Sequence, residues 1–214
     1  MNDEERLAFV MKLRARGIRD TNVLRALETI PRELFVPRRY ADLAGKDVAL
    51  PLSCGQTTLS PYEVARLIEA LQVDSAHRVL EIGTGSGFVS AILAKLAHEV
   101  VSVERFQALA LQAKTRLAAL KLKNVRVHWA DGLNLAPEFG IFDRILVNGV
   151  VAKVPPSLLG ALAVNGRLVA ARPATANETP HLFALVHDEA GNYAQTQLGF
   201  MRATAMLEGI SRGL

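Results

Sequence analysis

Three glycines alternate with other residues from Gly83 to Gly87, directly after the apolar run Val79 to Ile82. Glycines at such a place let the backbone take positive φ angles and let a ligand approach the main chain closely. The following residues, 88–97, are predicted to form a helix, whose first N–H groups have no partner within the helix. The pattern therefore indicates a strand, a tight turn and a helix that bind a nucleotide-like ligand. An ordinary tight turn that binds nothing is the alternative.

Two acidic residues accompany this turn. Glu81 precedes the first glycine, and Glu104 ends the next apolar run, Val100 to Val103. The dinucleotide-binding fingerprint also places an acid about 20 residues after its glycines, but its third glycine would fall where Phe88 stands. A carboxylate has only acceptors, so Glu104 suits the two hydroxyls of a ribose. The alternative for Glu104 is a solvated acid at the start of a helix.

The elements that must position these residues alternate along the chain. Strands are predicted at 78–82, 99–103, 125–129, 142–147 and 167–172, with helices at 87–97, 107–120 and 156–163. This alternation predicts an α/β fold, a doubly wound and mostly parallel sheet whose ligand crevice lies at the carboxyl ends of the strands. Glu104, Asp131 and Asn148 are all expected at such ends.

The two ends of the chain have different patterns. Helices are predicted at 4–16, 23–30 and 61–71, with Asp20 as a cap for the second. An antiparallel hairpin is predicted from strands at 181–188 and 193–200, joined by a turn at 189–192. We therefore divide the chain into an N-terminal segment of helices and a loop (1–60), a ligand-binding α/β domain (61–200) and a tail (201–214). The tail has weak helical patterning and no assigned role.

Composition limits the partners and the compartment. The net charge is +4 and the pI about 9.5, but Lys and Arg are scattered, so nucleic acid is not expected as a partner. The single Cys54 excludes an intrachain disulfide, and we expect it to be a small buried hydrophobic residue rather than a reactive thiol. The five histidines have no metal-ligand spacing, so no metal is expected. No run reaches 18 apolar residues, and a cytoplasmic location without membrane contact is expected.

The chain resembles a known enzyme family in three places: the run Asp20 to Pro37, the loop Gly55-Gln56-Thr57 ahead of Pro61, and the glycine motif. The family is that of the protein-L-isoaspartate O-methyltransferases, which are class I S-adenosylmethionine-dependent methyltransferases with a Rossmann-like fold and an antiparallel C-terminal edge. The resemblance extends to about Pro173. It implies S-adenosyl-L-methionine as cofactor and S-adenosyl-L-homocysteine as product. It also implies that the substrates are proteins or peptides carrying isoaspartyl residues, whose carboxylate is methylated in protein repair.

The same resemblance implies which residues bind the cofactor. They are Glu81, Gly83, Thr84, Gly85, Ser86, Gly87, Glu104, Asp131 and Gly132. In the family's pattern the glycine turn lies under the amino-acid portion of the cofactor, and the acid that aligns with Asp131 accepts a hydrogen bond from the adenine amine. A plain Asp-Gly turn is the alternative for the last two residues.

The substrate loop departs from the family pattern Gly-Gln-Thr-x-Ser-x-Pro. Thr57 aligns, but Leu59 stands at the serine position and Ser60 comes one place late. An isoaspartyl carboxylate is already ionised at pH 7, so catalysis requires mainly that the carboxylate be positioned and shielded from water. Thr57 and Ser60 are therefore the predicted catalytic residues. Ser60 has an alternative as the cap of the helix that Pro61 begins.

Two further functions remain open at this stage. Leu59 and the pair Asn148-Gly149 both depart from the family on the substrate side. They would fit a divergent paralogue that methylates another carboxylate or a dedicated partner protein. The chain would otherwise be a catalytically silent module that binds the cofactor and serves as an interaction surface. The sequence leaves the oligomeric state open.

Overall fold

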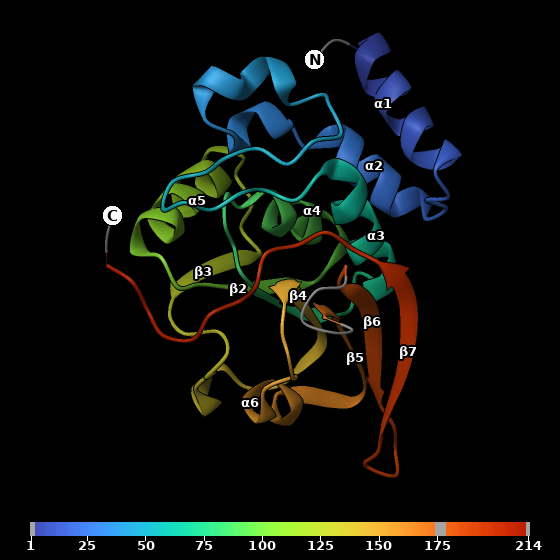
Figure 1. Cartoon of the computed structure of the whole chain (residues 1–214), viewed down its shortest axis with the longest axis vertical. Helices are drawn as coiled ribbons and strands as arrows, with labels where there is room; N and C mark the ends of the chain where they lie inside the picture. The colour runs from blue at the N-terminus through green and yellow to red at the C-terminus, as the bar shows by residue number, and fades with distance from the viewer. Residues whose placement is uncertain (1–2, 174–178, 213–214) are drawn as a thin grey trace.

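The computed structural model describes residues 3–173 and 179–212. Within them, one seven-stranded sheet has the order β3-β2-β1-β4-β5-β6-β7 (Figure 1). The strands are β1 (Arg78–Ile82), β2 (Glu99–Glu104), β3 (Val125–Trp129), β4 (Phe142–Val150), β5 (Leu162–Arg172), β6 (His181–His187) and β7 (Tyr193–Phe200). Strands β1 to β5 pair in parallel, whereas β6 and β7 pair antiparallel. The predicted α/β sheet with an antiparallel C-terminal edge is confirmed.

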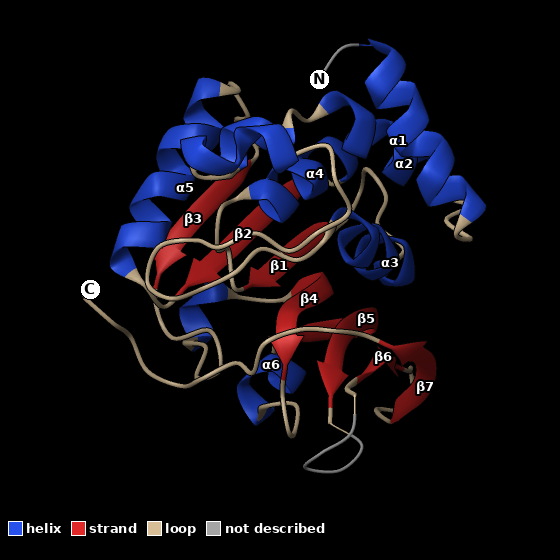
Figure 2. Ribbon diagram, turned by 45° about the horizontal axis from the view of Figure 1, so that its top comes forward, coloured by secondary structure: helices blue, strands red, loops and turns tan. Residues whose placement is uncertain are grey.

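Helices cover the two faces of the sheet unequally (Figure 2). The α-helices are α1 (Asp3–Ala15), α2 (Thr21–Thr29), α3 (Pro61–Leu71), α4 (Phe88–Leu96), α5 (Gln107–Ala119) and α6 (Pro156–Gly160). Short 3₁₀ helices lie at Arg32–Phe35, Arg38–Leu43 and Pro137–Phe139. Helices α1 to α5 contribute to the hydrophobic cluster on one face, and α6 contributes to the cluster on the other.

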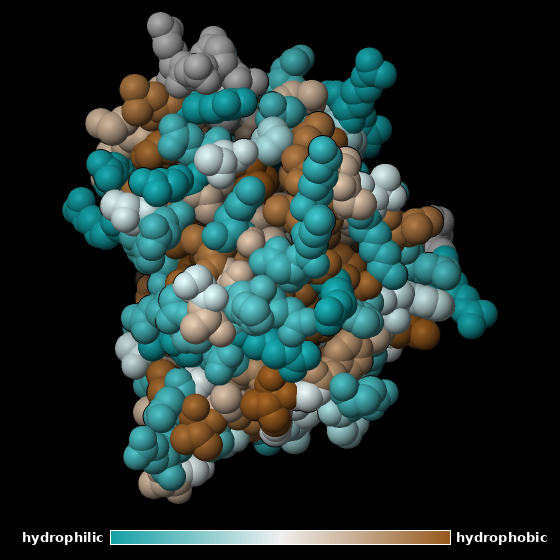
Figure 3. Space-filling view, turned by 180° about the vertical axis from the view of Figure 1, so that it is seen from behind, coloured by the Kyte–Doolittle hydropathy of each residue, from teal (hydrophilic) through white to brown (hydrophobic). Residues whose placement is uncertain are grey.

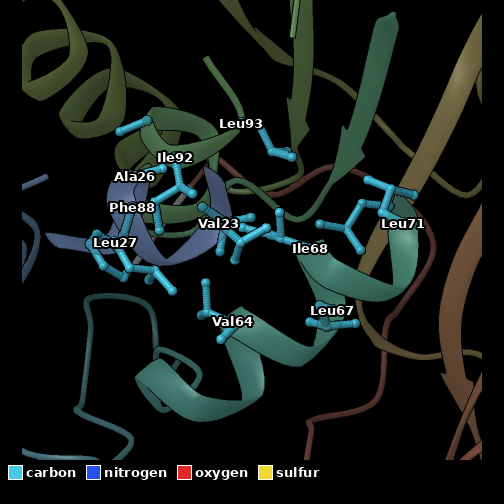
Figure 4. Packing of buried hydrophobic residues seen from close by; sticks show 14 of the residues in the cluster. Val23, Ala26, Leu27, Val64, Leu67, Ile68, Leu71, Phe88, Ile92 and Leu93 are labelled. Atoms are coloured by element: carbon cyan, nitrogen blue, oxygen red, sulfur yellow. The ribbon is translucent and has the colours of Figure 1, made fainter. Parts of the chain in front are cut away.

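Alternation along the strands divides the core between these faces. On β1, Val79 belongs to the cluster under the large helices and Leu80 to the cluster under α6, because successive side chains of a strand point to opposite faces. Figure 4 shows side chains of α2, α3 and α4 pointing toward one another, among them Val23, Ile68 and Ile92. The N-terminal helices therefore share one core with the helix that follows the glycine turn.

Several predicted boundaries need correction. Strand β4 continues to Val150 rather than ending at 147, because Val150 pairs with Ala171 of β5 and bridges to Ala205. Asn148 therefore lies within a strand and not beyond its end. Helix α6 stops at Gly160, and β5 begins at Leu162, well before the predicted 167.

The C-terminal segment after β7 crosses back over the sheet instead of forming a helix (Figures 1 and 2). Val150 N donates to Thr204 O, and Met206 N donates to Val150 O, both at 2.8 Å. Farther on, Ser211 N donates to Arg105 O at 2.7 Å. The tail thus runs along the carboxyl ends of β4 and β2, where the ligand crevice is expected.

The surface carries no extended hydrophobic belt on the face shown in Figure 3, where hydrophobic and hydrophilic side chains are interspersed. Among the described residues, no helix combines the length and the apolar character needed to span a bilayer.

Candidate active site

The glycine turn joins β1 to α4 with φ angles of +88° at Gly83, +54° at Gly85 and +88° at Gly87. A Cβ at Gly85 would meet only Leu52 Cδ1, at 3.7 Å, so this glycine borders open space. A Cβ at Gly87 would lie 3.1 Å from Ala113 Cβ. Gly87 therefore lets α5 pack closely against the turn, whereas Gly85 leaves room for a ligand.

Glu104 ends β2 beside this turn and is only 4% exposed. Its Oε2 accepts a hydrogen bond from Gly85 N at 2.8 Å, and its Oε1 accepts one from Phe106 N at 2.9 Å. Burial raises the pKa of the Glu104 carboxyl, and these backbone N–H groups partly oppose that rise. Each oxygen keeps a further lone pair for a ligand donor.

Glu81 lies behind the turn rather than in the crevice. It is fully buried and accepts hydrogen bonds from the hydroxyls of Ser90 and Ser102 and from Asn148 Nδ2, the last at 2.6 Å. Burial raises the pKa of Glu81 to about 7, although all three hydrogen bonds favour the charged form. The structure thus places Glu81 as a link between β1, β2, β4 and α4.

Thr84 and Ser86 are buried within the turn. The hydroxyls of Thr84 and Ser102 are 2.5 Å apart, and Ser86 Oγ accepts from Phe88 N at 3.4 Å. Ser86 O also accepts from Arg116 Nη1 at 3.1 Å. Both side chains are therefore engaged in holding the turn.

Asp131 and Gly132 follow β3. Asp131 Oδ1 accepts from Leu133 N at 3.0 Å, which forms a local turn, and Oδ2 accepts from Gly209 N of the tail at 2.7 Å. A Cβ at Gly132 would lie 2.6 Å from Ile82 Cγ2, so only glycine fits there. Asp131 thus makes the local turn and also anchors the tail, and each of its oxygens retains acceptor capacity.

Three adjoining cavities occupy the crevice. The turn cavity, of about 110 Å³, is lined by Gly83, Gly85, Glu104, Gly132 and tail residues that include Met206. The outer groove, of about 630 Å³, is lined by Arg16, Asp47, Ser60, Glu63 and Arg202. A small cavity of about 60 Å³ lies between them, beside Leu59 and Ser86.

Thr57 and Asn148 each line all three of these cavities. They mark the point where the turn cavity meets the outer groove. A group bound on the glycine turn and a group bound in the groove would come together between these two side chains.

The loop before α3 contains three hydroxyls, and two of them hold the chain. Thr58 Oγ1 accepts hydrogen bonds from Leu50 N at 3.0 Å and from Arg32 Nη2 at 3.2 Å. Ser60 Oγ accepts from Glu63 N at 3.4 Å and caps α3. Thr57 is exposed, and within the described residues its hydroxyl forms no hydrogen bond. Thr57 is therefore the hydroxyl of this loop that is available to a substrate.

Arg32 organises this loop, a role that no sequence motif indicates. Its side chain is 4% exposed, and burial lowers the pKa of the guanidinium to about 10. The guanidinium donates to the carbonyl oxygens of Ala44, Lys46, Val48 and Leu59. In the sequence Arg32 stands beside Glu33 between Pro31 and Leu34, and this local pattern gives no signal for the role.

Two other features of the site differ from expectation. Cys54 is half-buried in a turn with φ +58°, so its assignment as a buried core residue is wrong. The tail forms part of the site: a Cβ at Gly149 would lie 2.4 Å from Met206 Sδ, and Met206 also borders Gly83.

Among the described residues, no group of three or more His, Cys, Asp or Glu side chains could hold a metal ion.

Solved structures share this fold. A structure of a protein-L-isoaspartate O-methyltransferase matches with a TM-score of 0.83 and 24% identity over 96% of this chain and 67% of that chain. A Plasmodium falciparum protein, described as an enzyme of the same kind in complex with S-adenosyl-L-homocysteine, matches with a TM-score of 0.80 and 22% identity over 96% of this chain and 98% of its own. The parallel sheet, the glycine turn after β1 and the acid ending β2 define a class I methyltransferase.

Sequence comparison gives the family. The family model for protein-L-isoaspartate(D-aspartate) O-methyltransferase matches residues 4–202. A protein-L-isoaspartate O-methyltransferase of Rhodopseudomonas palustris (strain BisA53) is 40% identical over 98% of this chain and 97% of its own length. One from Azorhizobium caulinodans is 42% identical over 97% of this chain and 94% of its own length. The chain belongs to the protein-L-isoaspartate(D-aspartate) O-methyltransferase family, and the predicted resemblance is confirmed.

Proposed function

We propose that this chain transfers the methyl group of S-adenosylmethionine to the L-isoaspartyl carboxylate of a damaged protein or peptide, at the point between Thr57 and Asn148. The observation that carries the proposal is that these two residues line both the turn cavity and the outer groove. Membership of the family supplies the reaction class, EC 2.1.1.77.

The residues of the turn cavity fit the proposed cofactor. Gly85 leaves the backbone open to a ligand, and Glu104 offers acceptor lone pairs for the ribose hydroxyls. Asp131 does not line the turn cavity but directly precedes Gly132, which does; its Oδ1 and Oδ2 accept backbone N–H groups and keep acceptor capacity for the adenine amine. When bound, S-adenosylmethionine supplies an electrophilic methyl group on its sulfonium.

On the substrate side, the chain mainly positions the carboxylate. An ionised carboxylate would need no proton transfer before accepting the methyl group, so the chain's residues would have only to hold it and exclude water. Thr57 would donate a hydrogen bond that orients the carboxylate in line with the departing sulfur, and Leu59 with the covering tail would limit water. Ser60 already caps α3 and is the weaker candidate for this role.

A methanol-release assay tests the proposal. The methyl ester of an isoaspartyl residue hydrolyses to methanol, so the chain should release methanol with an isoaspartyl peptide and not with the matching aspartyl peptide. Cofactor binding without methanol release would contradict the proposal and favour a paralogue acting on another carboxylate, or a silent binding module.

The proposal also includes the cellular location of the chain and its division into domains. We place the chain in the cytoplasm. Its single cysteine means that the fold depends on no intrachain disulfide, as is usual for proteins of that reducing compartment. The division at residues 60 and 200 stays a prediction. Helix α2, before the first boundary, shares one hydrophobic cluster with α3 and α4, which lie after it.

A further inference from the structure

Asn148 carries one of the few unsatisfied polar atoms in the interior. Among the described residues, the buried side-chain nitrogen and oxygen atoms without a hydrogen-bond partner are Arg32 Nε and Asn148 Oδ1. Burying an amide oxygen without a donor is unfavourable, so its retention at the crevice needs an explanation.

The neighbours of Asn148 fix which end of its amide is free. Asn148 Nδ2 donates to Glu81 Oε1 at 2.6 Å and to Gly83 O at 3.0 Å. Both partners are acceptors, so the amide nitrogen must face them and the amide oxygen must face away. The unpaired atom is thus an acceptor rather than a donor, and it belongs to a side chain that lines all three cavities.

The strand order indicates which part of the cofactor this oxygen meets. Along the carboxyl edge of the sheet, Asp131 follows β3, Glu104 ends β2, the glycine turn follows β1, and Asn148 lies on β4. If Glu104 holds the ribose, Asn148 lies on the opposite side of the turn, beside the amino-acid portion. The α-ammonium of that portion is a charged donor, and an amide oxygen without a donor is a suitable acceptor for it.

We infer that Asn148 Oδ1 accepts a hydrogen bond from the α-ammonium group of the cofactor, and that Asn148 is therefore a binding residue of this chain. The inference rests on the proposed function.

Calorimetry with two ligands tests the inference. One ligand is S-adenosylhomocysteine, and the other is its analogue with the α-amine replaced by hydrogen. Asn148→Ala should weaken S-adenosylhomocysteine binding about tenfold or more, as expected for a bond to a charged donor, and change binding of the deaminated analogue less than about twofold. Leu133→Ala, in the same cavity, should weaken both ligands alike and serves as the matched control.

The outcomes separate the inference from the proposed function. An equal loss for both ligands, or no loss for either, would overturn the role of Asn148. An increased KM for the isoaspartyl peptide, with unchanged S-adenosylhomocysteine affinity, would assign the oxygen to the substrate side and also overturn it. If the wild-type chain bound no S-adenosylhomocysteine, the proposed function would fail as well. Asn148→Leu, of similar size, repeats the comparison if circular dichroism shows that Asn148→Ala is unfolded.

Discussion

The turn side of the crevice and the loop side are built by different means. On the turn side, the glycines rest on adjacent parallel strands, and the buried carboxylates of Glu81 and Glu104 tie those strands to the backbone. On the loop side, residues 44–60 have only the isolated bridge between Pro51 and Thr57 as strand pairing. The buried guanidinium of Arg32 holds that segment through its carbonyl oxygens.

Substitutions on the two sides should therefore have independent effects on cofactor affinity and on turnover. The turn side is fixed by the sheet, so substitutions there should change cofactor affinity without moving the loop. The loop side depends on a few side chains, so substitutions there should change turnover or stability and leave cofactor affinity intact.

The largest expected effect comes from Gly85→Val. A branched side chain at φ +54° is strained and would project toward the turn cavity, so cofactor binding should fall by about 100-fold or more. Calorimetry with S-adenosylhomocysteine measures the loss. Gly191→Val is the matched control, since it has φ +83° in the distant hairpin turn and no heavy atom within 4 Å of its Cβ. Unfolding of the Gly85 variant alone, seen by circular dichroism, would make Gly85 a structural residue.

Glu81 gives the turn side a pH dependence. Burial raises its folded pKa from 4.5 to about 7, so the folded chain binds more protons than the unfolded chain between these values. The contribution of Glu81 to stability is therefore largest below pH 4.5 and decreases as the pH rises to 7, by on the order of 3 kcal/mol. Glu81→Gln should remove that part of the slope in urea unfolding, while the raised pKa of Glu104 remains in both proteins. Parallel curves for the two proteins would contradict this account.

Glu104→Ala tests the ribose site. Loss of hydrogen bonds to a charged acceptor should weaken S-adenosylhomocysteine binding by about 1–3 kcal/mol, with turnover of saturated enzyme less affected. Glu99→Ala, at the other end of β2 and paired with Arg78 and Arg126, is the matched control and should leave affinity unchanged. Unchanged affinity in the Glu104 variant would remove this residue from the site.

The smallest effect is expected on the loop side, from Ser60→Ala. Loss of the α3 cap should lower the free energy of unfolding by about 1 kcal/mol and leave turnover within about twofold. Asp20→Ala, which removes the cap of α2, should cost a similar amount. A drop in turnover for the Ser60 variant alone would mean that Ser60 acts on the substrate.

The features predicted from sequence are those with a local cause. The period of the strands, the positive φ angles at Gly83 and Gly85, and the acid ending β2 depend on residues close together in the chain. The parallel pairing of the strands followed from their alternation with helices, whereas their order in the sheet was not predicted. Asp20 was likewise predicted as a cap, because capping depends on the next three residues.

The features that the sequence did not predict depend on contacts between distant residues. In the tail, Met206 N donates to Val150 O and Gly209 N donates to Asp131 Oδ2. No periodic pattern in the sequence predicts either contact. The role of Arg32 appears only when the loop folds over its buried guanidinium. The free oxygen of Asn148 likewise depends on Glu81, which lies on a neighbouring strand.

The most direct test of the account compares turnover of one isoaspartyl peptide by the wild-type chain, Thr57→Val, Ser60→Ala and Leu59→Ser, with S-adenosylhomocysteine affinity measured in each. Because Thr57 supplies the free hydroxyl where the two cavities meet, Thr57→Val should lower turnover by about 10²-fold with unchanged affinity, while Ser60→Ala and Leu59→Ser stay near the wild-type rate. Wild-type turnover by Thr57→Val, or no turnover by any of the four proteins with cofactor still bound, would contradict the account.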